Sequence, residues 1–169
     1  MITPAYVRTM AAYNEEMNRR LYDAAARLSD EARRADHGAF WGSIHGTLTH
    51  ILWGDRAWMA RFADWPKPET PIKQSAGMIP SFAELQTARR DADAGITAWA
   101  RSVDSAWLAS PLTWFSQSVQ REMSSPRSLL VTHFFNHQTH HRGQAHALIT
   151  GAGEKTGDTD LFIVVPAIR

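Results

Sequence analysis

The stretch SSPRSLLVTHFFNHQTHHRGQAHALITG, residues 124–151, contains five of the eight histidines of the chain. Ser125 followed by Pro126 is typical of a helix start, because serine caps the first turn and proline is tolerated inside it. Gly151 is a common residue just past the end of a helix. The stretch therefore predicts a long helix that starts at Ser125-Pro126 and runs to Thr150.

Three of these histidines lie on the apolar face of that helix. At about 100° per residue, His133 and His141 each lie about 40° from His137, on the same face as Leu130 and Phe134. Histidines at i and i+4 stand on adjacent turns, where two imidazoles can bind one metal ion. Spacing alone leaves three pairings open, because His137 can pair with His133, His140 or His141. A lone histidine in a helix is more often structural than a ligand.

Three further helices are indicated upstream by helix-start signals and by apolar residues every three or four positions. They are expected from Thr3-Pro4 to about Ser29, from near Ser43 to before Pro66, and from the capping box Ser81–Glu84 to about Val103. Residues 30–42 and 64–80 are predicted to be connections, the second because it holds four prolines.

These elements predict an all-α four-helix bundle in a single domain, residues 1–169. A short hairpin is expected between Leu112 and Met123, a segment rich in Thr, Trp, Phe and Val. The apolar residues Leu161 to Val165 could dock on the bundle or on a partner.

Composition excludes several functional classes. Lys plus Arg is 18 and Asp plus Glu is 17, so a net charge of +1 gives no reason to expect nucleic acid or a membrane surface as a partner. The chain has no cysteine, which excludes disulfides, thiolate zinc sites and a protein thiol nucleophile. Because no signal peptide or membrane-length apolar run is visible, we expect a cytoplasmic protein.

A third metal ligand must come from a facing helix, and His50 is the best candidate. It lies in the middle of the second predicted helix, about 120° from that helix's main apolar stripe. Its neighbours on that side are small: Gly46, Thr47, Gly54 and Ala57. Small side chains leave space for an ion and a ligand. We interpret His37 and His45 as structural.

Two stretches of the sequence resemble a known family. The run His137-Gln138-Thr139-His140-His141-Arg142-Gly143-Gln144, preceded by Asn136, resembles the signature of the DinB/YfiT-like family of metal-dependent enzymes. Residues 44–55, IHGTLTHILWGD, resemble that family's first histidine region, and Tyr13-Asn14 fits its opening helix. The likeness covers roughly residues 5 to 162.

The resemblance implies a bundle in up-down-down-up order with a long crossover between the second and third helices. It implies a divalent metal ion, most often zinc or nickel, bound by three histidines that fall on His50, His137 and His141. It also implies a homodimer. Members with an assigned reaction mostly use low-molecular-weight thiols.

The function expected is therefore that of a metal-dependent transferase with a low-molecular-weight thiol as cosubstrate. No catalytic residue is assigned from the sequence. One alternative is a metal-dependent hydrolase with Asp55 as base, although a buried Asp55 is more often a salt-bridge partner, for instance of Arg142, or a hydrogen-bond partner of a ligand histidine. Another is a non-catalytic metal- or small-molecule-binding stress protein.

For several polar and aromatic residues beside this site, the sequence allows both a pocket-lining and a structural interpretation. His133 and Gln144 could line a pocket or be satisfied polar residues at the wet end of the bundle. His140 is interpreted as an outer hydrogen-bonding residue. Trp114-Phe115 could cap the pocket, whereas the other tryptophans considered are core or loop anchors.

Overall fold

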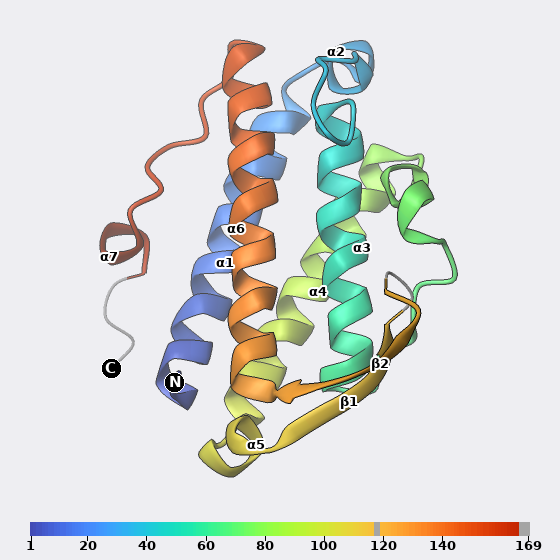
Figure 1. Cartoon of the computed structure of the whole chain (residues 1–169). Coiled ribbons are helices and arrows are strands. Elements are labelled where there is room, and N and C mark those ends of the chain that lie inside the picture. The colour runs from blue at the N-terminus through green and yellow to red at the C-terminus, as the bar shows by residue number, and fades with distance from the viewer. Residues whose placement is uncertain (117–118, 166–169) are drawn as a thin grey trace.

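Four long helices lie side by side in the computed structural model, which describes residues 1–116 and 119–165 (Figure 1). They are α1 (Pro4–Ala26), α3 (Ile44–Phe62), α4 (Phe82–Ser102) and α6 (Arg127–Gly151). The short helices are α2 (Asp30–Arg34), η1 (Ile72–Gly77), α5 (Ser105–Ala109) and α7 (Leu161–Val164). Strands β1 (Pro111–Ser116) and β2 (Arg121–Pro126) form an antiparallel hairpin. The described chain is thus mostly helical, with one small sheet.

Three long helices start at the predicted caps. The side chains of Thr3, Ser43 and Ser81 each accept a hydrogen bond from the backbone N–H three residues further on, as N-caps do. The expected cap of the fourth is wrong. Ser125 pairs with Leu112 in the hairpin, and α6 begins after Pro126 without a side-chain cap.

The connections contain more structure than the sequence predicted. The first helix ends at Ala26 because Ser29 caps a second helix, accepting a hydrogen bond from the Ala32 N–H, so α2 forms where only a connection was expected. The proline-rich segment holds a 3₁₀ helix, η1, directly after Pro71. The predicted hairpin is present and runs from Pro111 to Pro126.

The directions of the long helices follow from the colour gradient in Figure 1 and from their side-chain contacts. Helix α6 runs parallel to α1 and antiparallel to α3, and α3 runs parallel to α4. For α1 and α6 the contacts are Tyr6–Phe135 and Asn14–Arg142. For α3 and α6 they are Phe62–Phe134 and His50–His141. For α3 and α4 they are Asp55–Arg89 and Phe62–Trp99.

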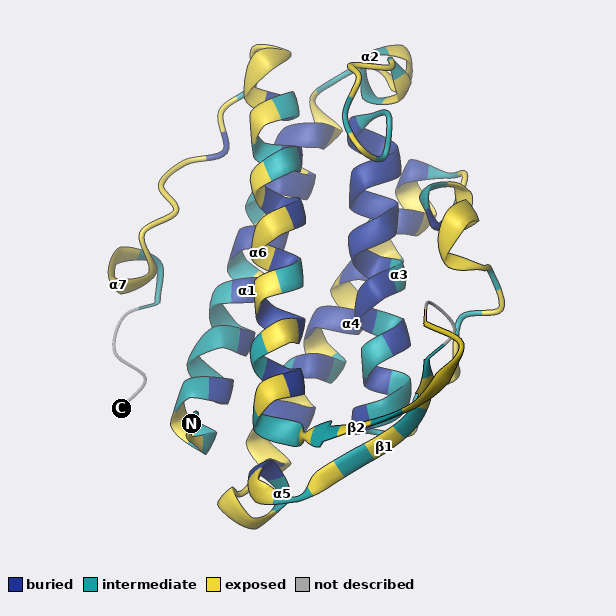
Figure 2. Cartoon of the chain, viewed as in Figure 1, coloured by how far each residue is buried: buried dark blue, intermediate teal, exposed yellow. Residues whose placement is uncertain are grey.

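The core is divided into two apolar clusters with a polar layer between them. Figure 2 shows the buried residues on the inward faces of the four long helices. One cluster surrounds Phe62, Trp99 and Phe134, and the other surrounds Leu48 and Leu85. The buried polar residues on the helix turns between them are Asn14, Asn18, Asp55, Arg89, Asp93, Gln138 and Arg142.

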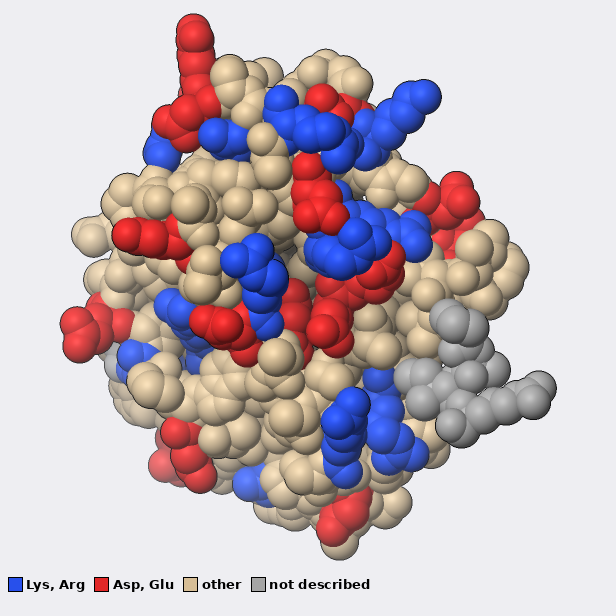
Figure 3. Space-filling view, turned by 180° about the vertical axis from the view of Figure 1, so that it is seen from behind, with Lys and Arg blue, Asp and Glu red and all other residues tan. Residues whose placement is uncertain are grey.

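The outer surface has no single dominant charge on the face seen from behind. Figure 3 shows acidic and basic side chains interspersed there, in keeping with the net charge of +1. Among the described helices, none is both long enough and apolar enough to cross a membrane.

Candidate metal centre

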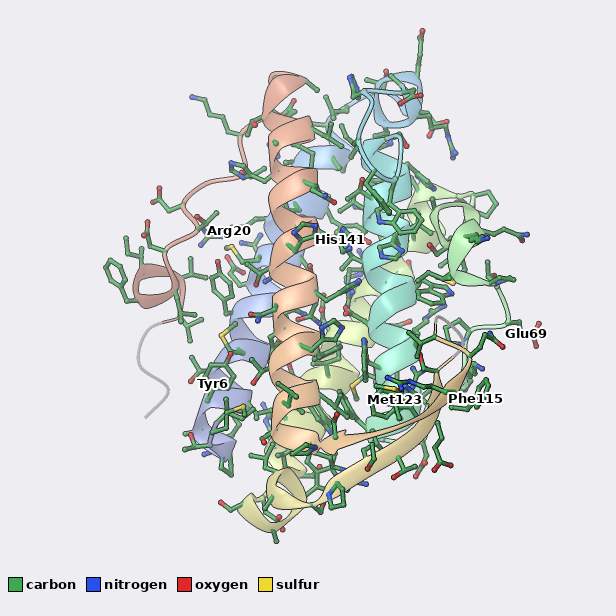
Figure 4. The ribbon with its side chains drawn as sticks, viewed as in Figure 1. Tyr6, Arg20, Glu69, Phe115, Met123 and His141 are labelled. Atoms are coloured by element: carbon green, nitrogen blue, oxygen red, sulfur yellow. The ribbon has the colours of Figure 1, made fainter. Side chains whose placement is uncertain are left out.

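Three histidines from two facing helices converge inside the bundle. His50 comes from α3, and His137 and His141 come from α6. One ring nitrogen of each lies within 4.8 Å of the others. The Nε2 atoms of His50 and His137 are 3.3 Å apart. His141 lies between α6 and α3 in Figure 4. The structure therefore brings together the three residues named as ligands from the sequence.

Two of these rings are held by hydrogen bonds through their outer nitrogen. Ser75 Oγ is 2.8 Å from Nδ1 of His50, and Gln144 Oε1 is 2.8 Å from Nδ1 of His141. An amide oxygen only accepts, so Nδ1 of His141 carries the proton and its Nε2 keeps a free lone pair. Outer hydrogen bonds of this kind orient histidines that bind metals.

His137 occupies the space that a glycine leaves on the facing helix. A Cβ atom at Gly54 would lie 2.6 Å from Cε1 of His137, which is far inside van der Waals contact. Nδ1 of His137 is buried and has no hydrogen-bond partner among residues 1–116 and 119–165. The small side chains around His50 were expected to leave space for an ion and a ligand, but at Gly54 the ring of His137 fills that space, and at Gly46 the Trp41 carbonyl does.

All three imidazoles are neutral at pH 7. Burial, with the neighbouring rings of His141 and His137 as a smaller cause, lowers the pKa of His50 to about 3. Burial, again helped by adjacent histidines, also lowers the pKa of His137 to about 3. Burial lowers the pKa of His141. A neutral imidazole offers a lone pair, so these three rings can bind a cation without first losing a proton.

Aromatic rings cover His50. Trp41 stacks on it with ring centroids 3.8 Å apart, and Trp53 lies on it at 5.9 Å. The sequence interpretation missed Trp41 and Ser75, since both lie in segments expected to be connections. Neither carries a periodic signal that could have revealed it, because only the folding of the loops onto α3 places them there.

The other three histidines of α6, His133, His140 and His146, lie outside the cluster. His133 is exposed and packs against the edge of Trp58, with centroids 5.2 Å apart. His140 is exposed and contacts Gln144, Nε2 to Nε2, at 3.3 Å, which matches its expected outer position. Gln144 thus links His140 to His141.

Asp55 makes a buried ion pair, but its partner differs from the one expected. Its carboxylate accepts from Arg89 Nη1 at 2.6 Å and from Gln138 Nε2 at 2.8 Å. The salt bridge to Arg142 that the sequence suggested is wrong, because Arg142 donates to Asn14 instead. Helix α4 supplies Arg89, and sequence spacing gives no relation between two residues on different helices.

The donor set fits one divalent ion. Imidazole nitrogen suits late first-row ions such as zinc and nickel. The buried Nδ1 of His137, which has no hydrogen-bond partner among the described residues, fits a polar ring whose bonding a cation would complete. Within the described residues, the cluster consists of the three histidines alone.

Three converging neutral imidazoles on facing helices of a helical bundle form a cluster that is compatible with binding of a metal ion. The DinB family model matches residues 1–165, and the chain belongs to the DinB family. Neither a curated protein nor a solved structure matches the chain.

Proposed function

We propose that this protein binds one divalent metal ion, zinc or nickel, through His50, His137 and His141. The observation that carries the proposal is the convergence of three neutral rings, two of them oriented from behind by Ser75 and Gln144. Three protein ligands leave a coordination position open for a substrate, as in catalytic rather than structural zinc sites.

The reaction we propose is group transfer from an electrophilic substrate to a low-molecular-weight thiol cosubstrate: the thiol loses its proton, its sulfur forms the new bond, and the bond to the substrate's leaving group breaks. An ion with three neutral ligands keeps its full charge and supplies a Lewis acid that lowers the pKa of a thiol. The thiol must come from a second molecule, because the chain has no cysteine. The aromatic rings of Trp41 and Trp53 shield His50 from water.

A hydrolase is the less favoured reading of the same centre. It needs a free base, and Asp55, the carboxylate considered for that role, is fully buried and committed to Arg89 and Gln138. A non-catalytic binding protein is the remaining alternative, and an assay of thiol conjugation by the metal-loaded protein distinguishes it.

The proposal extends to the arrangement of the molecule. We propose the up-down-down-up order of the family, with residues 63–81 as the crossover, which the helix directions support. We further propose a cytoplasmic homodimer that takes a small-molecule substrate, with neither nucleic acid nor membrane as partner.

The decisive experiment is metal analysis of untagged protein together with the variants His50→Ala, His137→Ala and His141→Ala. We expect about one ion per chain in the wild type and a loss in each variant, whereas His37→Ala, an exposed control, keeps the ion. The metal-loaded protein is then assayed for conjugation of several thiols to a panel of electrophiles. Wild type that neither contains nor takes up zinc or nickel overturns the centre. A loaded protein without any conjugation favours the non-catalytic alternative.

A further inference from the structure

A cavity of about 230 Å³ lies between α1 and α6. Its α6 residues, Thr139, Arg142, Gly143 and His146, face α1, whereas the histidine cluster faces α3. Figure 4 shows Arg20, from the α1 wall, and His141 on opposite sides of α6. This cavity is therefore separate from the candidate metal centre.

The wall contains a buried cation, Arg142, for which the described part of the chain supplies no ion-pair partner. Arg142 is 5% exposed, and its guanidinium donates to two neutral groups, Asn14 Oδ1 and, at 3.2 Å, Thr139 Oγ1. Arg89, which is equally buried, has carboxylates at 2.6 and 2.8 Å. Among the described residues, no carboxylate forms a salt bridge with Arg142. The carboxylates of Asp55 and Asp93 act on the Arg142 charge only from beyond ion-pair distance, because both pair directly with Arg89. A buried charge without a counter-ion in contact is costly, so the position is suited to an anionic ligand.

Further donors and apolar groups complete the wall. Arg20 borders the cavity, with its Nε paired to Glu16 and its Nη1 donating to the Asp158 carbonyl. His146 Nδ1 lies 2.7 Å from the Thr156 hydroxyl. Met17 and Leu21 add apolar surface. A ligand with both an oxyanion and a small apolar part matches this combination.

The segment that follows α6 closes the cavity on its outer side. Figure 1 shows this segment descending alongside α1 and α6. The Tyr13 hydroxyl donates to the Thr159 carbonyl at 2.6 Å, and Arg27 Nε pairs with Glu154 at 2.6 Å. Gly157 has φ +78°, a conformation that favours glycine, and a Cβ there would lie 3.3 Å from Arg20. The segment is thus held in place by side chains of α1.

We propose that this cavity binds a small organic or inorganic oxyanion, a carboxylate or a phosphate, which pairs with Arg142. The apolar part of an organic ligand packs on Met17 and Leu21. This site does not depend on the metal centre or on the proposed reaction.

Isothermal titration calorimetry of the full chain, with its bound metal, tests the proposal with two probes, benzoate and inorganic phosphate. The blocking variant is Gly143→Leu. A Cβ at Gly143 meets open space, and a helical leucine leans toward the preceding turn, over Thr139 and the cavity. The matched control is Gly143→Ala, which adds a Cβ without reaching across. Arg142→Met removes the guanidinium, and His137→Ala removes a metal ligand.

We expect one or both probes to bind the wild type and the Gly143→Ala control alike. Gly143→Leu should weaken binding by about tenfold or more, because the leucine side chain occupies the space for the ligand, and Arg142→Met should weaken it at least as much, because the charge-assisted hydrogen bond is lost. The probe that binds more tightly identifies the class of anion. If Arg142→Met does not fold, Gly143→Leu still decides, since its position is open and exposed.

Three results would overturn the proposal. One is the absence of binding by both probes at a concentration of about 10 mM, because a Kd above that value is weaker than that of an ordinary ligand site. Another is equal affinity of Gly143→Leu and Gly143→Ala. The third is loss of binding in His137→Ala, which would assign the anion to the metal centre instead.

Discussion

Gly54 determines whether His137 can approach His50. The ring of His137 lies against the backbone of α3 at this position, and no side chain larger than hydrogen fits beneath it. A glycine within a helix lowers stability relative to alanine, so its presence here has a packing reason rather than a helical one.

Gly54→Ala should therefore weaken metal binding by about tenfold or more, because the new methyl group displaces His137 from the cluster. Competition with a chromophoric chelator measures this affinity. Gly143→Ala makes the same change on α6 in open space and should leave the affinity unchanged. Equal affinities in the two variants would contradict the packing argument.

Ser75 acts on the same centre from outside α3. Its hydroxyl lies 2.8 Å from Nδ1 of His50 and is fully buried. Ser75→Ala should lower metal affinity by about 10- to 100-fold without unfolding the chain, because the ring loses the bond that orients it. Ser124→Ala, an exposed position in β2, is the control. Retained affinity in Ser75→Ala would show that packing by Trp41 alone orients the ring.

The helices α3 and α4 are joined by an ion pair rather than by apolar packing alone. Asp55 and Arg89 are almost completely buried, and Asp93 holds the other side of the same guanidinium at 2.8 Å. A buried pair contributes little net stability while intact, but breaking it leaves an uncompensated charge.

Asp55→Asn should lower the free energy of unfolding by about 3 kcal/mol or more and should leave the metal content unchanged. Urea denaturation and metal analysis measure the two quantities. Asp23→Asn, at an exposed position of α1, should change neither. If Asp55→Asn instead keeps its stability while the metal-loaded variant loses hydrolytic turnover, the hydrolase with Asp55 as its base is supported.

The stability of the whole molecule depends on pH through its buried histidines. The pKa of His50 is about 3 in the folded chain and about 6.5 when unfolded. The unfolded chain therefore takes up protons that the folded chain refuses, and stability falls as the pH falls from about 6.5 toward 3. Asp93 opposes this trend between pH 4 and 6, because burial raises its pKa to about 6.

Comparison with a variant isolates the contribution of His50. In metal-free protein, the loss of unfolding free energy between pH 7 and pH 5 should be about 2 kcal/mol smaller in His50→Gln than in the wild type. Urea denaturation at the two pH values, with a chelator present, measures the difference. His37→Gln, at an exposed position, should behave as the wild type does. The same pH dependence in both variants would mean that His50 is protonated in the folded chain.

The sequence by itself determined the long helices and the three histidines of the cluster. Both depend on local rules, because helix caps act over three residues and the 3.6-residue period places His137 and His141 on one face. His50 followed from its place in the second helix, whereas the choice of His141 rather than His133 or His140 as the partner of His137 required the family resemblance, since spacing along α6 left three possibilities.

Only the tertiary structure decided the surroundings of these residues. Ser75 and Trp41 reach His50 from irregular segments, and Arg89 replaces Arg142 as the partner of Asp55. The cavity at Arg142 forms where α1, α6 and the following segment meet. Contacts between elements distant in the chain depend on how the helices pack, and no periodic pattern within one segment encodes them.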